Sequence, residues 1–67
     1  MNERMKQVIY RIATTRSALL GIEHALKSGH GRDACKRMAV LHEEIGLIAH
    51  AMANAVMAEE ARKMEGE

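Results

Sequence analysis

Residues 45–58 read IGLIAHAMANAVMA, and only His50 and Asn54 in this stretch are plainly polar. A helix that is apolar on nearly every side has more surface to bury than one short chain can cover. At 14 residues, the stretch is shorter than the roughly 20 apolar residues that cross a bilayer. We therefore expect a buried helix and no membrane partner. The stretch predicts self-assembly, and it names no activity.

Length and composition indicate a small, single-domain helical protein. The chain has 67 residues, which predicts a single domain over residues 1–67 whose core needs support from a disulfide, a metal or a second subunit. Cys35 is the only cysteine, so no intrachain disulfide can form, and its free thiol favours a cytoplasmic location. The chain lacks proline and is dominated by good helix formers. A formal net charge of +1 is not typical of a nucleic-acid or membrane specialist.

One glycine-containing stretch divides the chain. It is KSGHGRD, residues 27–33, and it predicts a turn between two helices. We expect the first helix over about 2–28 with Asn2 as its N-cap, the turn at 29–32, the second helix over about 33–63, and a frayed tail at 64–67. Gly29 suits the left-handed conformation that follows many helix C-termini.

Each predicted helix carries an apolar seam in which the residue number steps alternately by three and four. In the first helix the seam is Met5, Val8, Ile12, Thr15, Leu19, Ile22 and Leu26. In the second helix it is Ala34, Met38, Leu41, Ile45, Ile48, Met52 and Ala55. A short turn makes the two helices antiparallel. The predicted fold class is therefore all-α, an antiparallel helical hairpin in which Ile12 faces Ile48.

Charge supports the same register. The first helix is mainly basic, and the end of the second helix is acidic. The register brings Glu59 and Glu60 beside Arg4 and Lys6, and it brings Glu23 beside Lys36 and Arg37. Exposed pairs of this kind contribute up to about 1 kcal/mol each. We expect ion pairs between the helices at both ends of the hairpin.

The second helix has further apolar residues outside its seam. Burying one Val, Leu or Met side chain contributes about 1.5–3 kcal/mol, so association of hairpins is favoured. We expect a homodimer in which two hairpins form a four-helix bundle, or a larger helical oligomer. The predicted oligomer interface comprises Val40, Leu47, Ile48, Ala51, Met52, Ala55 and Val56.

Patterns for catalysis or metal binding are missing from the sequence. Cys35 and His42 lie about 10 Å apart along a helix, too far to share one ion. We interpret Cys35 as a small buried apolar residue and His42 as a histidine at the bundle edge. Glu43 and Glu44 are adjacent on a helix and point in different directions. The sequence thus predicts no enzyme, no catalytic residues, no metal site and no cofactor.

A polar band in the middle of the first helix is open to two interpretations. Its members are Tyr10, Arg11, Thr14, Arg16 and Ser17. The first interpretation is a solvated outer face, with Thr15 as a polar seam residue that sets the register. The second is a surface for a partner or an anionic ligand, because arginine and tyrosine are frequent anchors in interfaces and arginine binds phosphate.

These observations predict a non-enzymatic, oligomeric interaction protein, such as a small bacterial or phage regulator, adaptor or inhibitor that acts by protein contact. One alternative is a sensor that binds a small ligand, nucleotide or metal between subunits, near Arg11, Arg16 and His42. A second alternative is a nucleic-acid-binding regulator. In length and plan the chain is similar to the plasmid copy-control hairpins that dimerise into an RNA-binding four-helix bundle. We do not favour nucleic acid, because the basic residues are spread out and balanced by acids.

Overall fold

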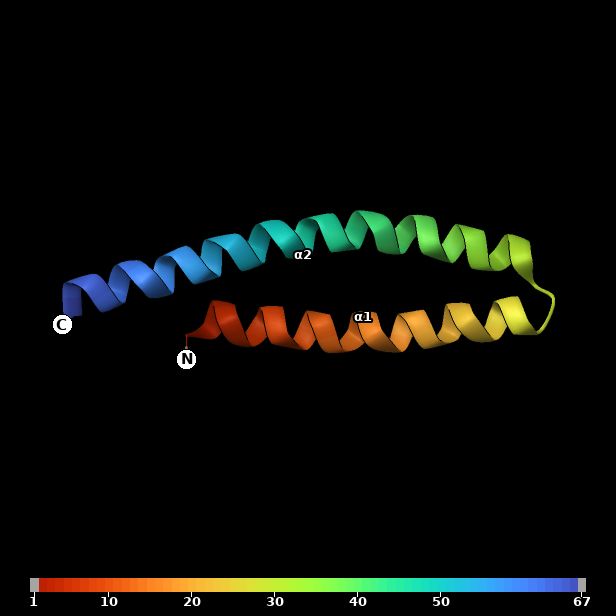
Figure 1. Ribbon diagram of the computed structural model, residues 1–67, viewed down its shortest axis with the longest axis horizontal. Coiled ribbons are helices and arrows are strands. Elements are labelled where there is room, and N and C mark those ends of the chain that lie inside the picture. The colour runs from red at the N-terminus through yellow and green to blue at the C-terminus, as the bar shows by residue number, and fades with distance from the viewer. Residues whose placement is uncertain (1, 67) are drawn as a thin grey trace.

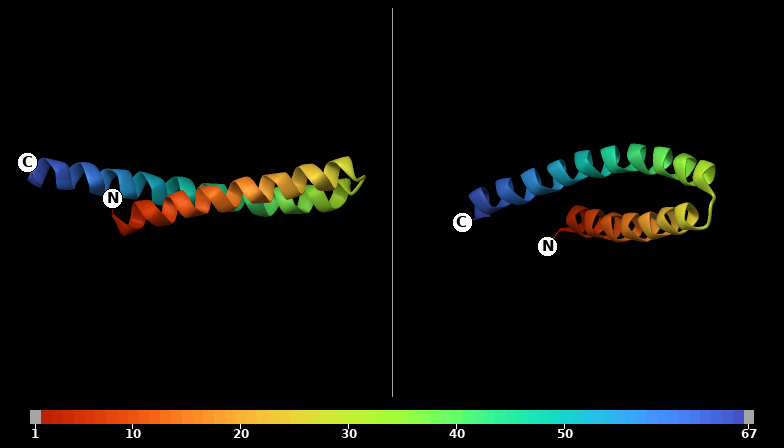
Figure 2. Two further views of the ribbon diagram at one scale, coloured as in Figure 1. Left: turned by 90° about the horizontal axis from the view of Figure 1, so that it is seen from below. Right: turned by 45° about the vertical axis from the view of Figure 1, so that its right-hand side comes forward.

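The computed structural model describes residues 2–66, with side chains from 2 to 64. It contains two helices, α1 (Glu3–Lys27) and α2 (Gly31–Gly66), joined by a three-residue turn (Figure 1). The helices run antiparallel, and α2 extends beyond the start of α1 (Figures 1 and 2). The principal extents are 55 × 16 × 12 Å. The predicted all-α antiparallel hairpin is confirmed.

Local hydrogen bonds define both ends of α1. The side chain of Asn2 accepts a hydrogen bond from the Met5 N–H at 2.7 Å, as an N-cap does. At the other end the His30 N–H donates to the Ala25 carbonyl at 2.8 Å. The Gly29 N–H donates to the Leu26 carbonyl at 3.2 Å. This is the Schellman pattern, and Gly29 adopts the expected left-handed conformation with φ 83°.

The second helix is longer than the sequence predicts. It begins at Gly31, where the His30 carbonyl accepts the Ala34 N–H at 3.0 Å, and it continues to Gly66. The expected tail at 64–67 is therefore helical as far as Gly66, and residue 67 lies outside the described residues. Good helix formers and the Arg62–Glu59 ion pair at 2.8 Å support this last part of the helix.

The core is a single row of side chains along each helix. Residues exposed by 7% or less are Val8, Ile22, Ala25, Ala34, Leu41, Ile48 and Ala55. The four in α2 are spaced seven apart, and in α1 the half-buried Thr15 lies midway between Val8 and Ile22. All but Ala25 belong to the predicted seams. The hairpin thus buries every second seam residue.

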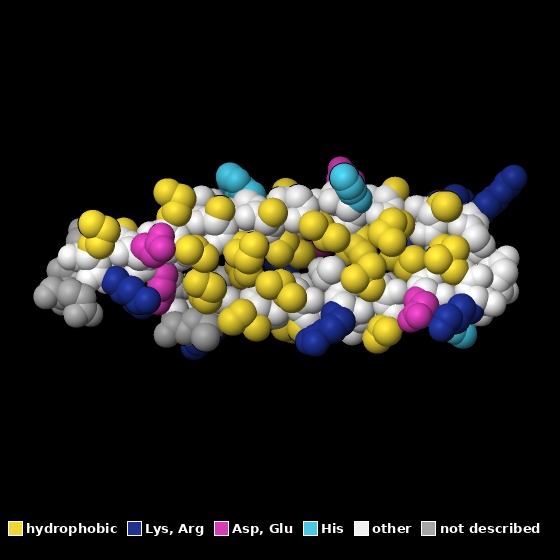
Figure 3. All heavy atoms as spheres, in the orientation of Figure 1, with side chains coloured by type: hydrophobic (Ala, Val, Ile, Leu, Met, Phe, Trp, Pro, Cys, Tyr) yellow, Lys and Arg dark blue, Asp and Glu magenta, His cyan; other side chains and the backbone are white. Residues whose placement is uncertain are grey.

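Six of the alternate seam residues remain uncovered, and together with the flanking Ile9 and Val56 they form what we call the apolar face. It comprises Ile9, Ile12, Leu19, Leu26, Met38, Ile45, Met52 and Val56, each 40–59% exposed. Hydrophobic side chains gather along one face of the molecule over both helices (Figure 3). One helix cannot cover both halves of a heptad seam. The uncovered half of each seam is therefore apolar surface that a second hairpin could cover.

The helix register agrees with the prediction. The Asn2 amide donates to the Glu59 carboxylate at 2.8 Å across the ends of the hairpin. Near the turn, a Cβ placed on Gly21 would lie 3.7 Å from the Arg37 guanidinium. Both contacts are within two positions of the expected pairing of residues.

The predicted ion pairs between helices are wrong. Among residues 2–64, each ion pair joins two residues of the same helix. They are Lys6–Glu3, Lys27–Glu23, Arg37–Asp33 and Arg62–Glu59. A partner three or four positions away is already within reach on the helix surface, so less side-chain ordering is needed than for a pair across the hairpin.

Truncating a buried leucine should affect stability far more than truncating an exposed one. Leu41→Ala should lower the free energy of unfolding by about 2–5 kcal/mol, because Leu41 is part of the core cluster. Leu20→Ala is the matched control, since Leu20 is exposed outside the apolar face, and it should change stability by about 0.5 kcal/mol or less. Urea unfolding followed by circular dichroism measures both. Equal effects would contradict the assigned core.

Two glycine substitutions should have opposite signs. Gly29→Ala should destabilise by about 1–2 kcal/mol, because Gly29 has positive φ. Gly46→Ala should stabilise by about 0.5–1 kcal/mol, because Gly46 lies inside α2 and an added Cβ there meets nothing within 4 Å. Thermal unfolding of the two variants at matched protein concentration tests this. A gain in stability for Gly29→Ala would be incompatible with the turn described above.

Candidate functional site

The side of the hairpin opposite the apolar face is a groove between the two helices. In both helices, the residue four positions after a buried seam residue belongs to the apolar face, as Ile12 and Met52 do, except for Glu59 after Ala55. A residue three positions after one lines the groove, as Arg11 and Ala51 do. Residues of both helices line the same hollows there. The groove and the apolar face therefore lie on opposite flanks of the core.

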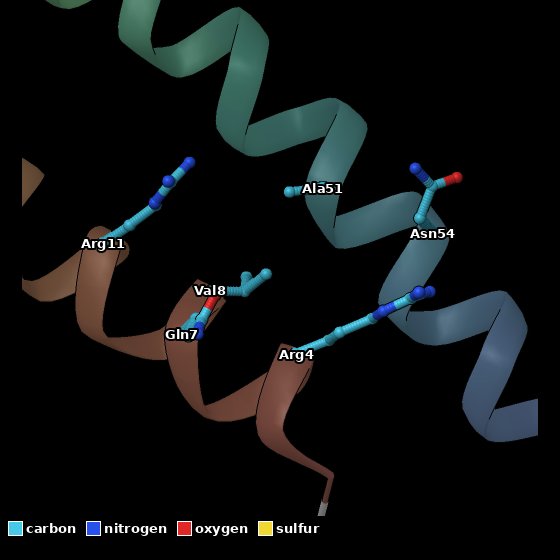
Figure 4. A pocket seen from close by; sticks show the side chains of 6 residues that line it. All are labelled: Arg4, Gln7, Val8, Arg11, Ala51 and Asn54. Atoms are coloured by element: carbon cyan, nitrogen blue, oxygen red, sulfur yellow. The ribbon is translucent and has the colours of Figure 1, made fainter.

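The first hollow of this groove lies between the beginning of α1 and the second half of α2. It has a volume of about 290 Å³, and its lining residues are Arg4, Gln7, Val8, Arg11, Ala51 and Asn54 (Figure 4). The side chains of Arg4 and Arg11 extend from α1 toward α2 (Figure 4). Val8 and the small Ala51 supply its apolar surface. We call this space the arginine hollow.

Closer to the turn, the groove has a different character. Arg37 is paired with Asp33 at 2.9 Å, and it lines the same hollow as Glu44 and the exposed Val40. An adjoining hollow is formed by α2 alone, and it is lined by Val40, Glu43, Glu44 and Leu47. Basic, acidic and apolar side chains are mixed in this part. The arginine hollow is lined by two arginines and no acidic residue. A further hollow, lined by Ser17, Gly21 and Val40, also has a basic residue and no acidic one, but that residue is Arg37, which already pairs with Asp33.

The structure divides the predicted polar band. Arg11, Thr14 and Ser17 line hollows of the groove, whereas Tyr10 is 70% exposed. The Thr14 hydroxyl donates to the Arg11 carbonyl at 2.8 Å, so it is satisfied within its own helix. Arg11 and Arg16 are five residues apart, which places them about 140° apart around α1. They therefore cannot form one site within a single hairpin.

The arginine hollow contains residues that sequence reasoning missed. Arg4, Gln7 and Asn54 were not among the predicted site residues. The spacing of Arg4 and Arg11 by seven residues was the available signal, since it places both on one face of a helix. That signal is weak without knowledge of which flank of α1 faces a hollow. The contribution of Asn54 could be inferred only from the register of the two helices.

The predicted interface residues fall in three places. Ile48 and Ala55 are buried within the hairpin and have almost no surface to offer a second copy. Val40 and Ala51 line hollows of the groove, whereas Leu47 lines a hollow formed by α2 alone. Met52 and Val56 belong to the apolar face.

Cys35 and His42 each follow a buried residue of α2, and both are exposed. The interpretation of Cys35 as a buried apolar residue is wrong for the hairpin, because one step along a helix turns the side chain by about 100° from the core. Over residues 2–64, the histidine, cysteine and acidic side chains form no group of three or more that could hold a metal ion. In the described part of the chain, neither helix has an apolar segment sufficient to cross a bilayer.

Comparison of the chain with protein-family models, curated proteins and solved structures found no match.

The exposure of Tyr10 has a measurable consequence. Tyr10→Ser should change the midpoint of thermal unfolding by about 4 °C or less, because an exposed side chain contributes little to the folded state. Ile22→Ser is the matched buried change, and it should lower the midpoint strongly. Thermal scans followed by circular dichroism measure the unfolding midpoint of both variants. A large drop for Tyr10→Ser would mean that the aromatic ring is covered in the assembled protein.

Proposed function

We propose that this protein is a non-enzymatic, homo-oligomeric interaction protein whose hairpins pair through the apolar face into a four-helix bundle. A single observation carries the proposal. Six alternate residues of the two heptad seams, with Ile9 and Val56 beside them, are 40–59% exposed on one side of the hairpin. Two such faces placed together complete the four-helix arrangement that the seams are suited to.

The size of the exposed surface supports this pairing. A compact monomer of 7.4 kDa would expose about 4,200 Å², whereas the hairpin exposes 5515 Å². The radius of gyration is 16.0 Å, against about 11 Å for a compact chain of this length. A standard interface buries about 800 Å² on each partner. The excess surface of one hairpin is sufficient for an interface of that size.

The free energy of burial also favours pairing. The apolar face offers eight large side chains at a little under half exposure. Covering them contributes roughly 5–10 kcal/mol per copy. Two copies together therefore gain about 10–20 kcal/mol, compared with an association cost of about 4–15 kcal/mol. The C2 dimer is the simplest closed arrangement in which each copy covers the other.

The proposed role follows from what the dimer leaves outside. With the apolar face covered, the groove and its charged side chains remain at the surface of the bundle. A small helical bundle with a mixed polar surface is suited to acting by contact, as a regulator, adaptor or inhibitor does. The exposed thiol of Cys35 supports a reducing, cytoplasmic location, where free cysteines persist.

A charge placed in the apolar face should separate the copies. Ile45→Lys should shift the sedimentation mass from a dimer to a single chain, because Ile45 lies in that face and a buried lysine is costly. Leu47→Lys is the matched control on α2. Leu47 is 65% exposed beside the groove, and this variant should remain a dimer. Sedimentation equilibrium at micromolar concentration gives the masses.

The opposite behaviour of the two variants would contradict pairing through the apolar face. If Leu47→Lys dissociates the protein and Ile45→Lys does not, the hairpins pair through the groove. If the unsubstituted protein sediments as a single folded chain, self-association is refuted altogether.

A further inference from the structure

The arginine hollow has the chemistry of an anion-binding site. Two guanidinium groups from α1 share it with the amide side chains of Gln7 and Asn54, and no carboxylate lines it. Guanidinium N–H groups form paired hydrogen bonds with carboxylate and phosphate oxygens, and amide N–H groups can add further donors. All the polar side chains of this hollow can donate hydrogen bonds, and its only charges are positive.

Two carboxylates at this end of the hairpin, those of Glu3 and Glu59, have other partners. Glu59 accepts from Asn2 and from Arg62, both at 2.8 Å. Glu3 pairs with Lys6 at 3.8 Å. Within residues 2–64, neither Arg4 nor Arg11 takes part in an ion pair. The charge that would balance the two arginines is therefore not supplied by the hairpin.

Size and surroundings indicate a small ligand. The hollow has about 290 Å³, close to the lower end of the roughly 300–1,000 Å³ typical of ligand pockets. Glu44 lines the same groove further along, and its charge opposes a long phosphodiester chain. The small side chain of Ala51 leaves room at the wall formed by α2.

We propose that the arginine hollow binds a small molecule that carries phosphate or carboxylate groups, held between Arg4 and Arg11. The site lies on the flank opposite the apolar face, so it is complete within one hairpin and does not depend on the proposed dimer. It also differs from a sensor site that joins Arg11 to Arg16 and His42. In the proposed four-helix bundle, the ligand would bind on the outer surface.

Nuclear magnetic resonance titration of the full ¹⁵N-labelled chain tests the proposal. Pyrophosphate is the probe in one arm and glutarate in the other, both at constant ionic strength. We expect saturable shifts of the Arg4 and Arg11 side-chain N–H signals and of the Gln7 and Asn54 amide signals in at least one arm. The arm that responds identifies phosphate or carboxylate as the preferred group. Absence of saturable shifts at these groups in both arms would overturn the proposal.

Three variants make the test specific. Arg4→Gln and Arg11→Gln should each weaken binding about tenfold or more, which is the loss of one charge-assisted contact. Arg16→Gln removes the same charge from the same helix but about 140° from Arg11, so it should bind normally. Equal weakening by Arg16→Gln would show attraction to net charge alone, and the proposal would fail.

A steric variant tests the role of the space in the hollow independently of its charges. Ala51→Leu keeps both arginines and places a larger side chain in the space that Ala51 leaves open. Binding should be lost while the helical circular dichroism signal is unchanged. Unchanged affinity in this variant would overturn the assignment of the ligand to the hollow.

Discussion

The structure depends on the contact between two heptad seams, each of which is wider than one partner helix can cover. Ile48 and Leu41 are buried against α1, while Ile45 and Met52, on the same seam, are 45% and 42% exposed. A row of side chains spaced by seven residues faces the neighbouring helix, and the row displaced by four residues is turned by about 40° toward one flank of that contact. This geometry explains both the stability of the hairpin and its unused apolar surface.

The two flanks of the core differ because one is formed by residues four positions after the buried row and the other by residues three positions after it. Four positions after a buried residue the side chains are large and apolar, as in Leu19 and Ile45. Three positions after one they are arginine, glutamate or alanine, as in Arg11 and Ala51. A large apolar row is suited to a second copy, whereas alternating long charged and small side chains leave hollows. The same heptad repeat thus produces a surface for self-association and a polar groove.

Local interactions define the ends of the helices, and they leave the charges of the groove available. The Asn2 cap and the Schellman turn at Gly29 use hydrogen bonds between near neighbours in sequence. The ion pairs of residues 2–64 are local as well, as in Lys27–Glu23. Glu3 and Glu59 pair within their own helices, and they do not neutralise Arg4 and Arg11 across the hairpin. The positive charge of the arginine hollow is a consequence of this local pairing.

The amino-acid sequence was enough to predict the two helices, the left-handed glycine in the turn, the antiparallel register and the seam residues. These depend on capping, on backbone conformation and on the spacing of apolar residues along one chain. The tertiary structure alone decided which half of the seam is buried and that Arg4 and Arg11, not Arg11 and Arg16, share a hollow. Both outcomes depend on the rotation of each helix about its own axis. The sequence leaves that rotation open, because the row with Val8 and the row with Ile12 satisfy the same heptad pattern until a neighbouring helix covers one of them.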